Sequence, residues 1–281
     1  MKRREFLKAV TAGVIVAGFA PDAMAQMASF FAATPQAHYD DHIKDYLNKM
    51  QYFDKPHKDD VCLDRKKYRL LKSSVKRLKR LQRIVGHGNF YLLDFDYAIK
   101  IARNYSLVGS FSRAELEFLE MIFYEGAPLY GFFGEKPIKN LTARIRRREV
   151  AKVPNTGNYL YKGIPLETYR KIKQDVGDQV ILTSGVRSVI KQFLLFLNKA
   201  YRNNGNLSLA SRSLAPPGYS FHGIGDFDVG QADLGAANFT ERFTSTKVYR
   251  KLVDLGYIKF RYLRDNMFGV RFEPWHIKIN S

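Results

Sequence analysis

The chain has 281 residues, of which 46% are hydrophobic and 26% are charged. This composition is ordinary for a globular protein and excludes a wholly disordered one. Lys and Arg outnumber Asp and Glu by 46 to 27, and the resulting net charge of +19 favours anionic partners such as nucleic acid, anionic lipid or acidic polymers. The single cysteine, Cys62, excludes an intramolecular disulfide framework and a cysteine-rich zinc cluster.

The first 25 residues predict a secretory signal peptide. Basic residues precede a short apolar stretch at 9–20, and Ala23, Met24 and Ala25 form a small-x-small cleavage site. The pair Arg3-Arg4, followed by Glu-Phe-Leu-Lys, resembles the twin-arginine export motif. We therefore expect an exported, periplasmic protein, with an uncleaved amphipathic membrane anchor as the alternative. Export argues against nucleic acid as the partner.

Residues 26–150 predict a mostly helical region. Within it, residues 65–85 carry apolar side chains at the three-four spacing of one helix face. These apolar residues are Tyr68, Leu71, Val75, Leu78, Leu81 and Val85. The opposite face of residues 65–83 carries only basic charges. It predicts either peripheral contact with an anionic wall or membrane surface, or a solvated outer face of a core-packed helix.

A second helix in this region has a well-marked start. Ser112 is followed three positions later by Glu115, which is the pattern of a capping box. We expect this helix to end near Gly126 and Pro128, since both residues disfavour helix continuation.

Residues 151–281 predict an α+β domain, after a turn at 154–158. We expect a small antiparallel sheet with flanking helices, preceded by the helical region, because strands and helices do not alternate regularly. The predicted helices are 166–174, 188–201 and 246–255. The predicted strands are 179–183, 226–229 and two closing strands that end at 276–279. Residues 208–218 predict a loop.

The last hundred residues hold two histidines, His222 and His276, each near acidic residues. A catalytic zinc takes three protein ligands from histidine and carboxylate and keeps one position open for water. Asp228 lies between two apolar residues on a predicted strand and could complete such a site, and Asp226 is the rival because it lies on the same strand face. Glu273, three residues before His276, could take a proton from the water.

Three motifs in this part of the chain resemble those of the VanY-like D-alanyl-D-alanine carboxypeptidases, within the wider group of lysostaphin-type and hedgehog-fold zinc proteins. Ser-Gly-x-Arg-Ser-x-x-x-Gln is matched at 184–192, and Glu-x-Trp-His is matched at 273–276. In the middle motif, Ser-x-His-x-x-Gly-x-Ala-x-Asp, the aspartate comes one residue early. A one-residue deletion after Gly225 restores the pattern on Asp228.

The resemblance implies a role for each motif residue. It implies zinc bound by His222, Asp228 and His276, with Glu273 as the catalytic base. It also implies three substrate-binding residues, which are Arg187, Ser220 and Trp275.

The resemblance further implies a zinc-dependent peptidase that acts on peptidoglycan stem peptides. By that resemblance we favour D-alanyl-D-alanine carboxypeptidase activity. A peptidoglycan endopeptidase of the same fold and a non-catalytic zinc- or wall-binding module are the alternatives. We divide the chain accordingly into a signal peptide (1–25), a helical region (26–150) and a zinc peptidase domain (151–281).

Overall fold

The computed structural model describes residues 45–264 and 266–279. The predicted signal peptide lies outside these residues. Residues Tyr46–Ser281 form one compact unit, and the division at residue 150 stays a prediction. Among the described residues, no helix combines the length and the apolar character that a membrane span requires.

Helices dominate the first part of this unit. They are α4 (Arg65–Val85), α5 (His87–Phe90), α6 (Phe95–Asn104) and α7 (Arg113–Tyr124). The helix predicted at 65–85 is confirmed, and it buries Leu71, Val75, Leu78 and Leu81. The predicted capping box is also confirmed, because Ser112 and Glu115 each accept the other's backbone N–H. Short 3₁₀ turns follow at Ala127–Tyr130 and Arg147–Glu149.

The second part mixes strands and helices, as the sequence predicts. A hairpin of β1 (Val150–Lys152) and β2 (Tyr159–Tyr161) leads into α8 (Ile164–Val176). There follow β3 (Val180–Ser184), α9 (Val189–Arg202), α10 (Leu207–Ser211), β4 (Phe227–Gln231), α11 (Lys247–Asp254) and β5 (His276–Ile277), with 3₁₀ turns at Phe221–Gly223, Gly235–Phe239 and Glu241–Ser245.

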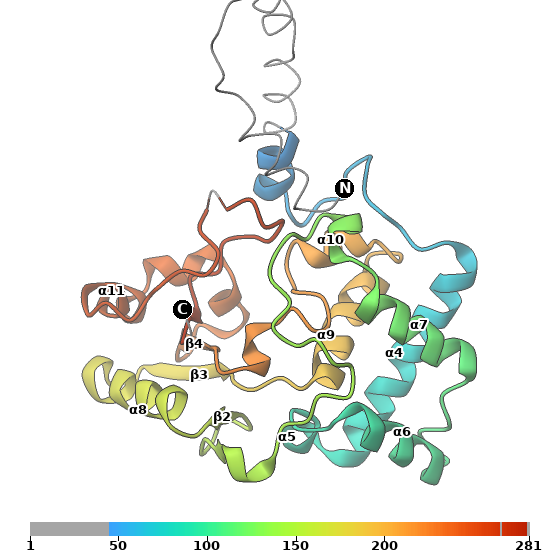
Figure 1. The fold of residues 1–281 in the computed structure, drawn as a ribbon. Helices are drawn as coiled ribbons and strands as arrows, with labels where there is room; N and C mark the ends of the chain where they lie inside the picture. The colour runs from blue at the N-terminus through green and yellow to red at the C-terminus, as the bar shows by residue number, and fades with distance from the viewer. Residues whose placement is uncertain (1–44, 265, 280–281) are drawn as a thin grey trace, which may run out of the picture. The chain divides into compact units, whose positions relative to one another are not determined.

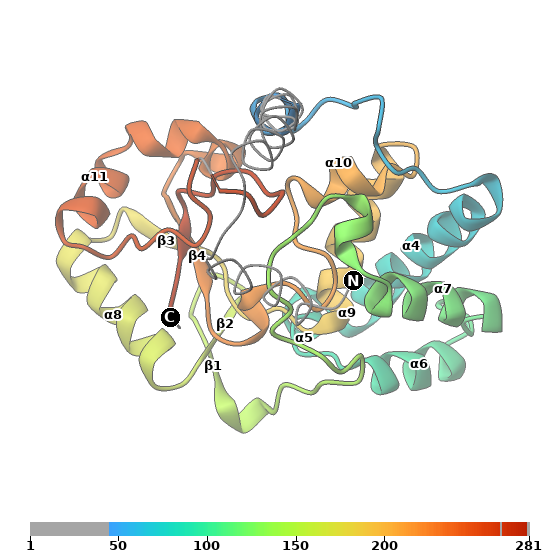
Figure 2. The same cartoon turned by 45° about the horizontal axis from the view of Figure 1, so that its top comes forward.

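Most of the described elements pack into two large hydrophobic cores, and a third, smaller cluster contains Leu92, Val150 and Val186. Figures 1 and 2 both show α8 and α11 beside the β3–β4 sheet, and α4, α6 and α7 on the other side with α9. One core contains the apolar faces of α4, α7 and α9, whereas the other joins α8, α11 and the sheet. Burial of the apolar faces is the main favourable contribution to this arrangement.

Two local expectations are wrong. The segment 208–218 begins with a helix rather than a loop, because the side chain of Asn206 accepts a hydrogen bond from the N–H of Leu209 and caps α10. Of the two expected closing strands, only β5 forms among the described residues, and it spans His276–Ile277.

The sheet is antiparallel, with β4 between β3 and β5. Its register places Asp228 opposite His276 on one side and opposite Ser184 on the other. A bulge between Leu182 and Ser184 produces the second pairing. The sheet therefore brings together residues from all three sequence motifs.

Candidate metal centre and active site

The buried side chains of His222, Asp228 and His276 form a group that could hold a metal ion. One ligand atom from each residue lies within 4.8 Å of the others. Asp228 and His276 are neighbours across β4 and β5, whereas His222 comes from the 3₁₀ turn Phe221–Gly223. Two histidines and one carboxylate are a donor set that suits catalytic zinc.

The ring of His222 is oriented by the backbone. Its Nδ1 donates to the carbonyl oxygen of Gly185 at 2.8 Å, so Nε2 carries the lone pair and lies 3.2 Å from Oδ1 of Asp228. Burial, together with the charge of Arg187, lowers the pKa of His222. The neutral imidazole is the form that binds metal.

The ring of His276 lies between two carboxylates. Its Nε2 donates to Oδ2 of Asp226 at 2.8 Å, and its Nδ1 lies 3.2 Å from Oδ1 of Asp228. Burial opposes the charged imidazolium, but the hydrogen bonds to Asp226 and Asp228 outweigh burial and raise the pKa of His276 to about 9. Metal binding at Nδ1 therefore has to displace a proton.

Asp226 lies behind His276 rather than in the ligand group. It also accepts hydrogen bonds from Nε of Arg261 at 2.7 Å and from the N–H of Ile279 at 3.0 Å. Although burial opposes ionisation, these bonds and that of His276 lower the pKa of Asp226 to about 2. Of the two rival aspartates, Asp228 is the one placed between both histidines.

Arg187 contacts Asp228 directly. Its Nη2 lies 2.6 Å from Oδ2 of Asp228, and its Nε donates to Oγ of Ser184 at 2.8 Å. Burial disfavours the charged form of Asp228, but the positive charge of Arg187 and the hydrogen bond with His276 hold its pKa well below its usual range. The amide of Gln192 donates to the carbonyl of Arg187 at 2.9 Å and thereby fixes this loop.

Glu273 lies at the edge of the ligand group. Its Oε2 is 3.9 Å from Nδ1 of His276, and its side chain is 17% exposed. Burial raises the pKa of Glu273, while the positive charge of His276 opposes the shift. A carboxyl with a raised pKa beside a metal site is suited to take up and return a proton near neutral pH.

Comparison with known families gives an assignment for the part of the chain that holds these groups. Residues 165–280 match the model of VanY, described as D-alanyl-D-alanine carboxypeptidase. This match extends over less than half of the chain, and the matched residues, 165–280, form the VanY segment. All the predicted site residues lie within it. The comparison with curated proteins finds no match.

Solved structures resemble the chain more distantly. An LdcB LD-carboxypeptidase is 23% identical with a TM-score of 0.37, and the match covers 43% of this chain and 59% of that one. A VanY D,D-pentapeptidase from a VanB-type resistance cassette, in complex with Zn(II), is 24% identical with a TM-score of 0.40, covering 53% of this chain and 85% of that one. The D,D-dipeptidase VanXYg is 21% identical with a TM-score of 0.37, and the match covers 45% of this chain and 51% of that one.

Two further predicted residues of the VanY segment, Ser220 and Trp275, are buried. Ser220 directly precedes the turn that carries His222. Trp275 packs in the core that joins α8, α11 and the sheet, edge-on to Phe239 with 6.0 Å between ring centroids. The Trp275 side chain also lines a cavity of about 540 Å³. Their contact with substrate stays a prediction.

Sequence reasoning missed three residues around the site. Nε of Arg261 donates a hydrogen bond to Asp226. Tyr262 lies 6.5 Å from His276 between ring centroids. Tyr91 lies outside the VanY segment, and its carbonyl accepts a hydrogen bond from the N–H of Ser188 at 2.9 Å. Burial raises the pKa of the Tyr91 phenol. The charge of Arg187 lowers this pKa and the charge of Asp228 raises it. No motif marks these residues, because their positions depend on tertiary packing.

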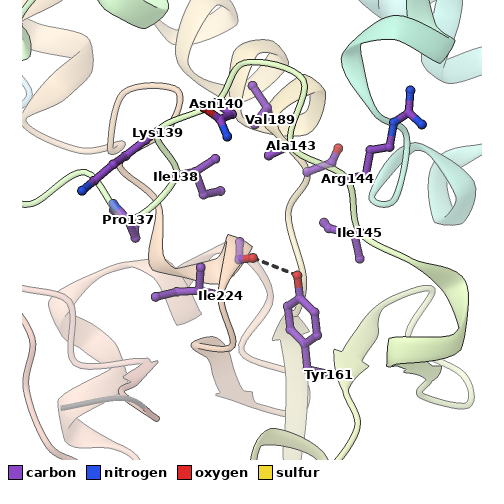
Figure 3. Close-up of a pocket in the computed structure, with 12 residues that line it drawn as sticks. Pro137, Ile138, Lys139, Asn140, Ala143, Arg144, Ile145, Tyr161, Val189 and Ile224 are labelled. Atoms are coloured by element: carbon purple, nitrogen blue, oxygen red, sulfur yellow. Dashed lines mark hydrogen bonds between the residues drawn. The ribbon is translucent and has the colours of Figure 1, made fainter.

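A cavity of about 360 Å³ lies beside the loops that carry Arg187 and His222 (Figure 3). Its wall includes Ser188, which follows Arg187, and Gly223, which follows His222. Residues between 137 and 145, which lie outside the VanY segment, form another part of the wall. Tyr161 closes one side, because its hydroxyl donates to the carbonyl of Gly223 at 2.8 Å. The region upstream of the VanY segment therefore shapes the surroundings of the site.

Proposed function

We propose that this protein is a zinc-dependent peptidase that removes the terminal D-alanine from peptidoglycan stem peptides ending in D-Ala-D-Ala. The observation that carries the proposal is the buried group of His222, Asp228 and His276, with Glu273 at its edge, inside the VanY segment. The intact base argues against a non-catalytic binding module, since binding alone requires no proton acceptor.

In this proposal His222, Asp228 and His276 hold the zinc. Bound zinc supplies a Lewis acid that polarises the scissile carbonyl and makes water more acidic. Glu273 accepts a proton from the attacking water and returns it to the leaving amine of D-alanine. Arg187, held by Asp228 and Ser184, contributes positive charge near the carbonyl oxygen, and Ser220 donates a hydrogen bond to the peptide.

The test uses the purified, zinc-loaded protein and a stem pentapeptide that ends in D-Ala-D-Ala. Mass spectrometry of the products is expected to show the loss of one D-alanine. Crosslinked wall fragments tested in parallel distinguish the second candidate, an endopeptidase, because it would cleave crosslinks and leave the free pentapeptide intact. Full activity of Glu273→Gln would contradict the assigned chemistry in either case.

We further propose that the protein is exported by the twin-arginine route and acts in the periplasm. The proposal is supported by the pattern of residues 1–25 and by the location of the proposed substrate outside the cytoplasm. Fractionation of cells that express the full chain is expected to place the protein in the periplasm. Replacement of Arg3 and Arg4 by Lys is expected to keep it in the cytoplasm.

We propose that the outer face of α4 contacts an anionic wall or membrane surface. Eight of its basic side chains are exposed and have no acidic neighbour on the helix: Arg65, Lys66, Lys67, Arg69, Lys72, Lys76, Arg80 and Arg83. Arg77 does not belong to this face, because it turns inward to an ion pair with Glu115 at 3.2 Å. A row of like charges along one helix is suited to an anionic surface and should bind it in a salt-dependent way.

Sedimentation with wall sacculi and with anionic lipid vesicles tests this contact. The triple variant Lys72→Gln, Lys76→Gln, Arg80→Gln is expected to weaken binding. The control triple Arg170→Gln, Lys247→Gln, Arg250→Gln removes the same charge from exposed positions elsewhere and is expected to bind like the parent. Equal loss in both triples would indicate a general effect of net charge.

A further inference from the structure

A carboxypeptidase has to recognise the free carboxylate at the end of its substrate. Among the sequence motifs, Arg187 is the cation available for this task. Its guanidinium, however, already bonds with Asp228 at 2.6 Å and with Ser184 at 2.8 Å. Recruiting it to a substrate carboxylate would leave the buried Asp228 without its charged partner, which is energetically costly.

Arg271 is a second guanidinium near the candidate active site. Its Cζ lies 4.8 Å from the ring centroid of Phe53 and 4.8 Å from that of Trp275. Among the described residues it makes no ion pair, and its Nε is buried with no hydrogen-bond partner. Contacts with aromatic rings orient a guanidinium but do not use the N–H groups at its edge, which remain available to bind a carboxylate in its plane.

The position of Arg271 is fixed by Arg212. The carbonyl of Arg212 accepts the N–H of Arg271 at 2.9 Å, and Nε of Arg212 donates to the carbonyl of Phe53 at 3.2 Å. Arg212 is itself buried in an ion pair with Asp60, with its Nη1 2.6 Å from Oδ1. The same buried residue therefore holds the backbone of Arg271 and the backbone of Phe53, whose ring contacts the Arg271 guanidinium.

Arg271 faces a cavity large enough for the end of a peptide. The cavity of about 540 Å³ is lined by Arg271, Trp275, Phe272 and Arg264, among others. The lining carboxylate, Glu241, is ion-paired with Arg264 at 2.9 Å and forms no ion pair with Arg271. By contrast, Arg144 beside the cavity of Figure 3 is already paired with Asp96 at 3.2 Å.

This cavity is also close to the reacting groups. Arg271, which lines it, precedes the proposed base Glu273 by two residues. Burial lowers the pKa of the Arg271 guanidinium, and the carboxylates of Glu273 and Asp228 oppose that shift, so their charges interact with it. A peptide whose terminal carboxylate is bound by Arg271 would extend from there towards Glu273.

We propose that Arg271 binds the C-terminal carboxylate of the peptide substrate in the cavity lined by Trp275, and that it thereby selects peptides with a free carboxyl end. The inference rests on the proposed peptidase function and deepens it. It assigns specificity for a chain terminus to a residue outside the three motifs, and it leaves Arg187 to act at the carbonyl.

Binding measurements test the assignment separately from catalysis. Isothermal titration calorimetry would compare diacetyl-Lys-D-Ala-D-Ala with its C-terminal amide, using the zinc-loaded Glu273→Gln protein so that neither peptide is consumed. We expect the free acid to bind about 10- to 100-fold more tightly than the amide, as a charge-assisted hydrogen-bonded pair implies. Arg271→Gln is expected to remove this preference without changing the affinity for the amide.

Two further variants separate a binding role from a structural one. Arg271→Lys, which retains the charge, is expected to recover part of the preference, and Arg250→Gln on the exposed face of α11 is expected to retain all of it. Three results would overturn the proposal. The parent could bind the acid and the amide equally, Arg271→Gln could keep the preference for the acid, or Arg271→Gln could weaken the binding of both peptides equally. A preference lost only in Arg187→Gln would assign the carboxylate to Arg187 instead. Absence of hydrolysis with Glu273 intact would contradict the peptidase function while leaving the binding result valid.

Discussion

Nε2 of His276 donates to Oδ2 of Asp226 at 2.8 Å, and the same ring presents Nδ1 to Asp228 at 3.2 Å. An ionised carboxylate only accepts hydrogen bonds, so the bond with Asp226 requires the proton to be on Nε2. That proton leaves Nδ1 as the nitrogen able to bind a metal. Such partners behind a ligand fix its tautomer and orientation and strengthen it as a donor.

The aspartate pair gives the first prediction. Asp226→Asn should weaken zinc binding about 10- to 100-fold without changing its stoichiometry, because the substitution removes the charged partner of His276 but no ligand. Asp228→Asn should weaken it further, because it alters a ligand itself. Competition titration against a chromophoric chelator measures both affinities, and Asp233→Asn at an exposed turn serves as the control. Stronger zinc binding by Asp228→Asn than by Asp226→Asn would reverse the assignment.

Replacing the base gives the second prediction. Glu273→Gln should lower kcat for release of D-alanine by about 10²- to 10⁴-fold, the usual contribution of a general acid–base group. Zinc content should stay at the parent level, because Glu273 lies outside the ligand group. A coupled assay for free D-alanine and metal analysis of the same sample give the two values. Loss of zinc together with activity would make Glu273 a ligand rather than the base.

Gly185 gives a prediction on stability. A Cβ built on this residue would lie 2.1 Å from the carbonyl oxygen of Tyr159, far inside contact distance. Since the carbonyl of Gly185 also orients His222, Gly185→Ala should destabilise the fold by about 1–3 kcal/mol or more and should weaken zinc binding as well. Chemical denaturation with and without zinc measures both effects. Gly126→Ala, whose added Cβ would meet only Pro128 at an ordinary 3.6 Å, should change stability little.

The buried pair of Asp60 and Arg212 gives a prediction on pH. Burial opposes ionisation of Asp60, but hydrogen bonds from Arg212, His57 and Asn206 outweigh it and lower the pKa from 3.8 to about 2. Because the folded pKa lies below the unfolded one, this stabilisation is complete above about pH 5 and is lost as the pH falls from 4 towards 2. The shift corresponds to about 2–3 kcal/mol.

Denaturation at pH 7 and pH 3 tests this linkage. Asp60→Asn should destabilise the protein at pH 7 by about 3–5 kcal/mol, since it leaves Arg212 buried without a counter-charge. The difference in the free energy of unfolding between Asp60→Asn and the parent should be smaller at pH 3 than at pH 7. A constant difference at both pH values would show that the carboxylate of Asp60 does not titrate as described.

Local patterns in the sequence were sufficient for much of the fold. The spacing of Leu71, Val75 and Leu78 predicted the buried face of α4, since a helix repeats every 3.6 residues whatever packs against it. The capping box at Ser112 and Glu115 marked the start of α7, because both of its hydrogen bonds are made within four residues. The short helix α10 was missed, because the sequence rich in Ser, Pro and Gly that follows it obscured the cap at Asn206.

For the site, the order of the motifs named the candidate ligands but left Asp226 and Asp228 as rivals. In the predicted strand 226–229 both lie on the same face, so alternation along the strand does not separate them. The pairing of β4 with β5 separates them, because it sets Asp228 opposite His276 and leaves Asp226 to bond the far nitrogen of the ring. Arg271, Phe53 and Trp275 come together in the same way, from distant segments joined by Arg212. The residues that could bind a metal and move a proton are evident from the sequence alone, because those capacities belong to the side chains. Which of their atoms face one another depends on the fold, because strand register and burial are set by contacts between residues far apart in the chain.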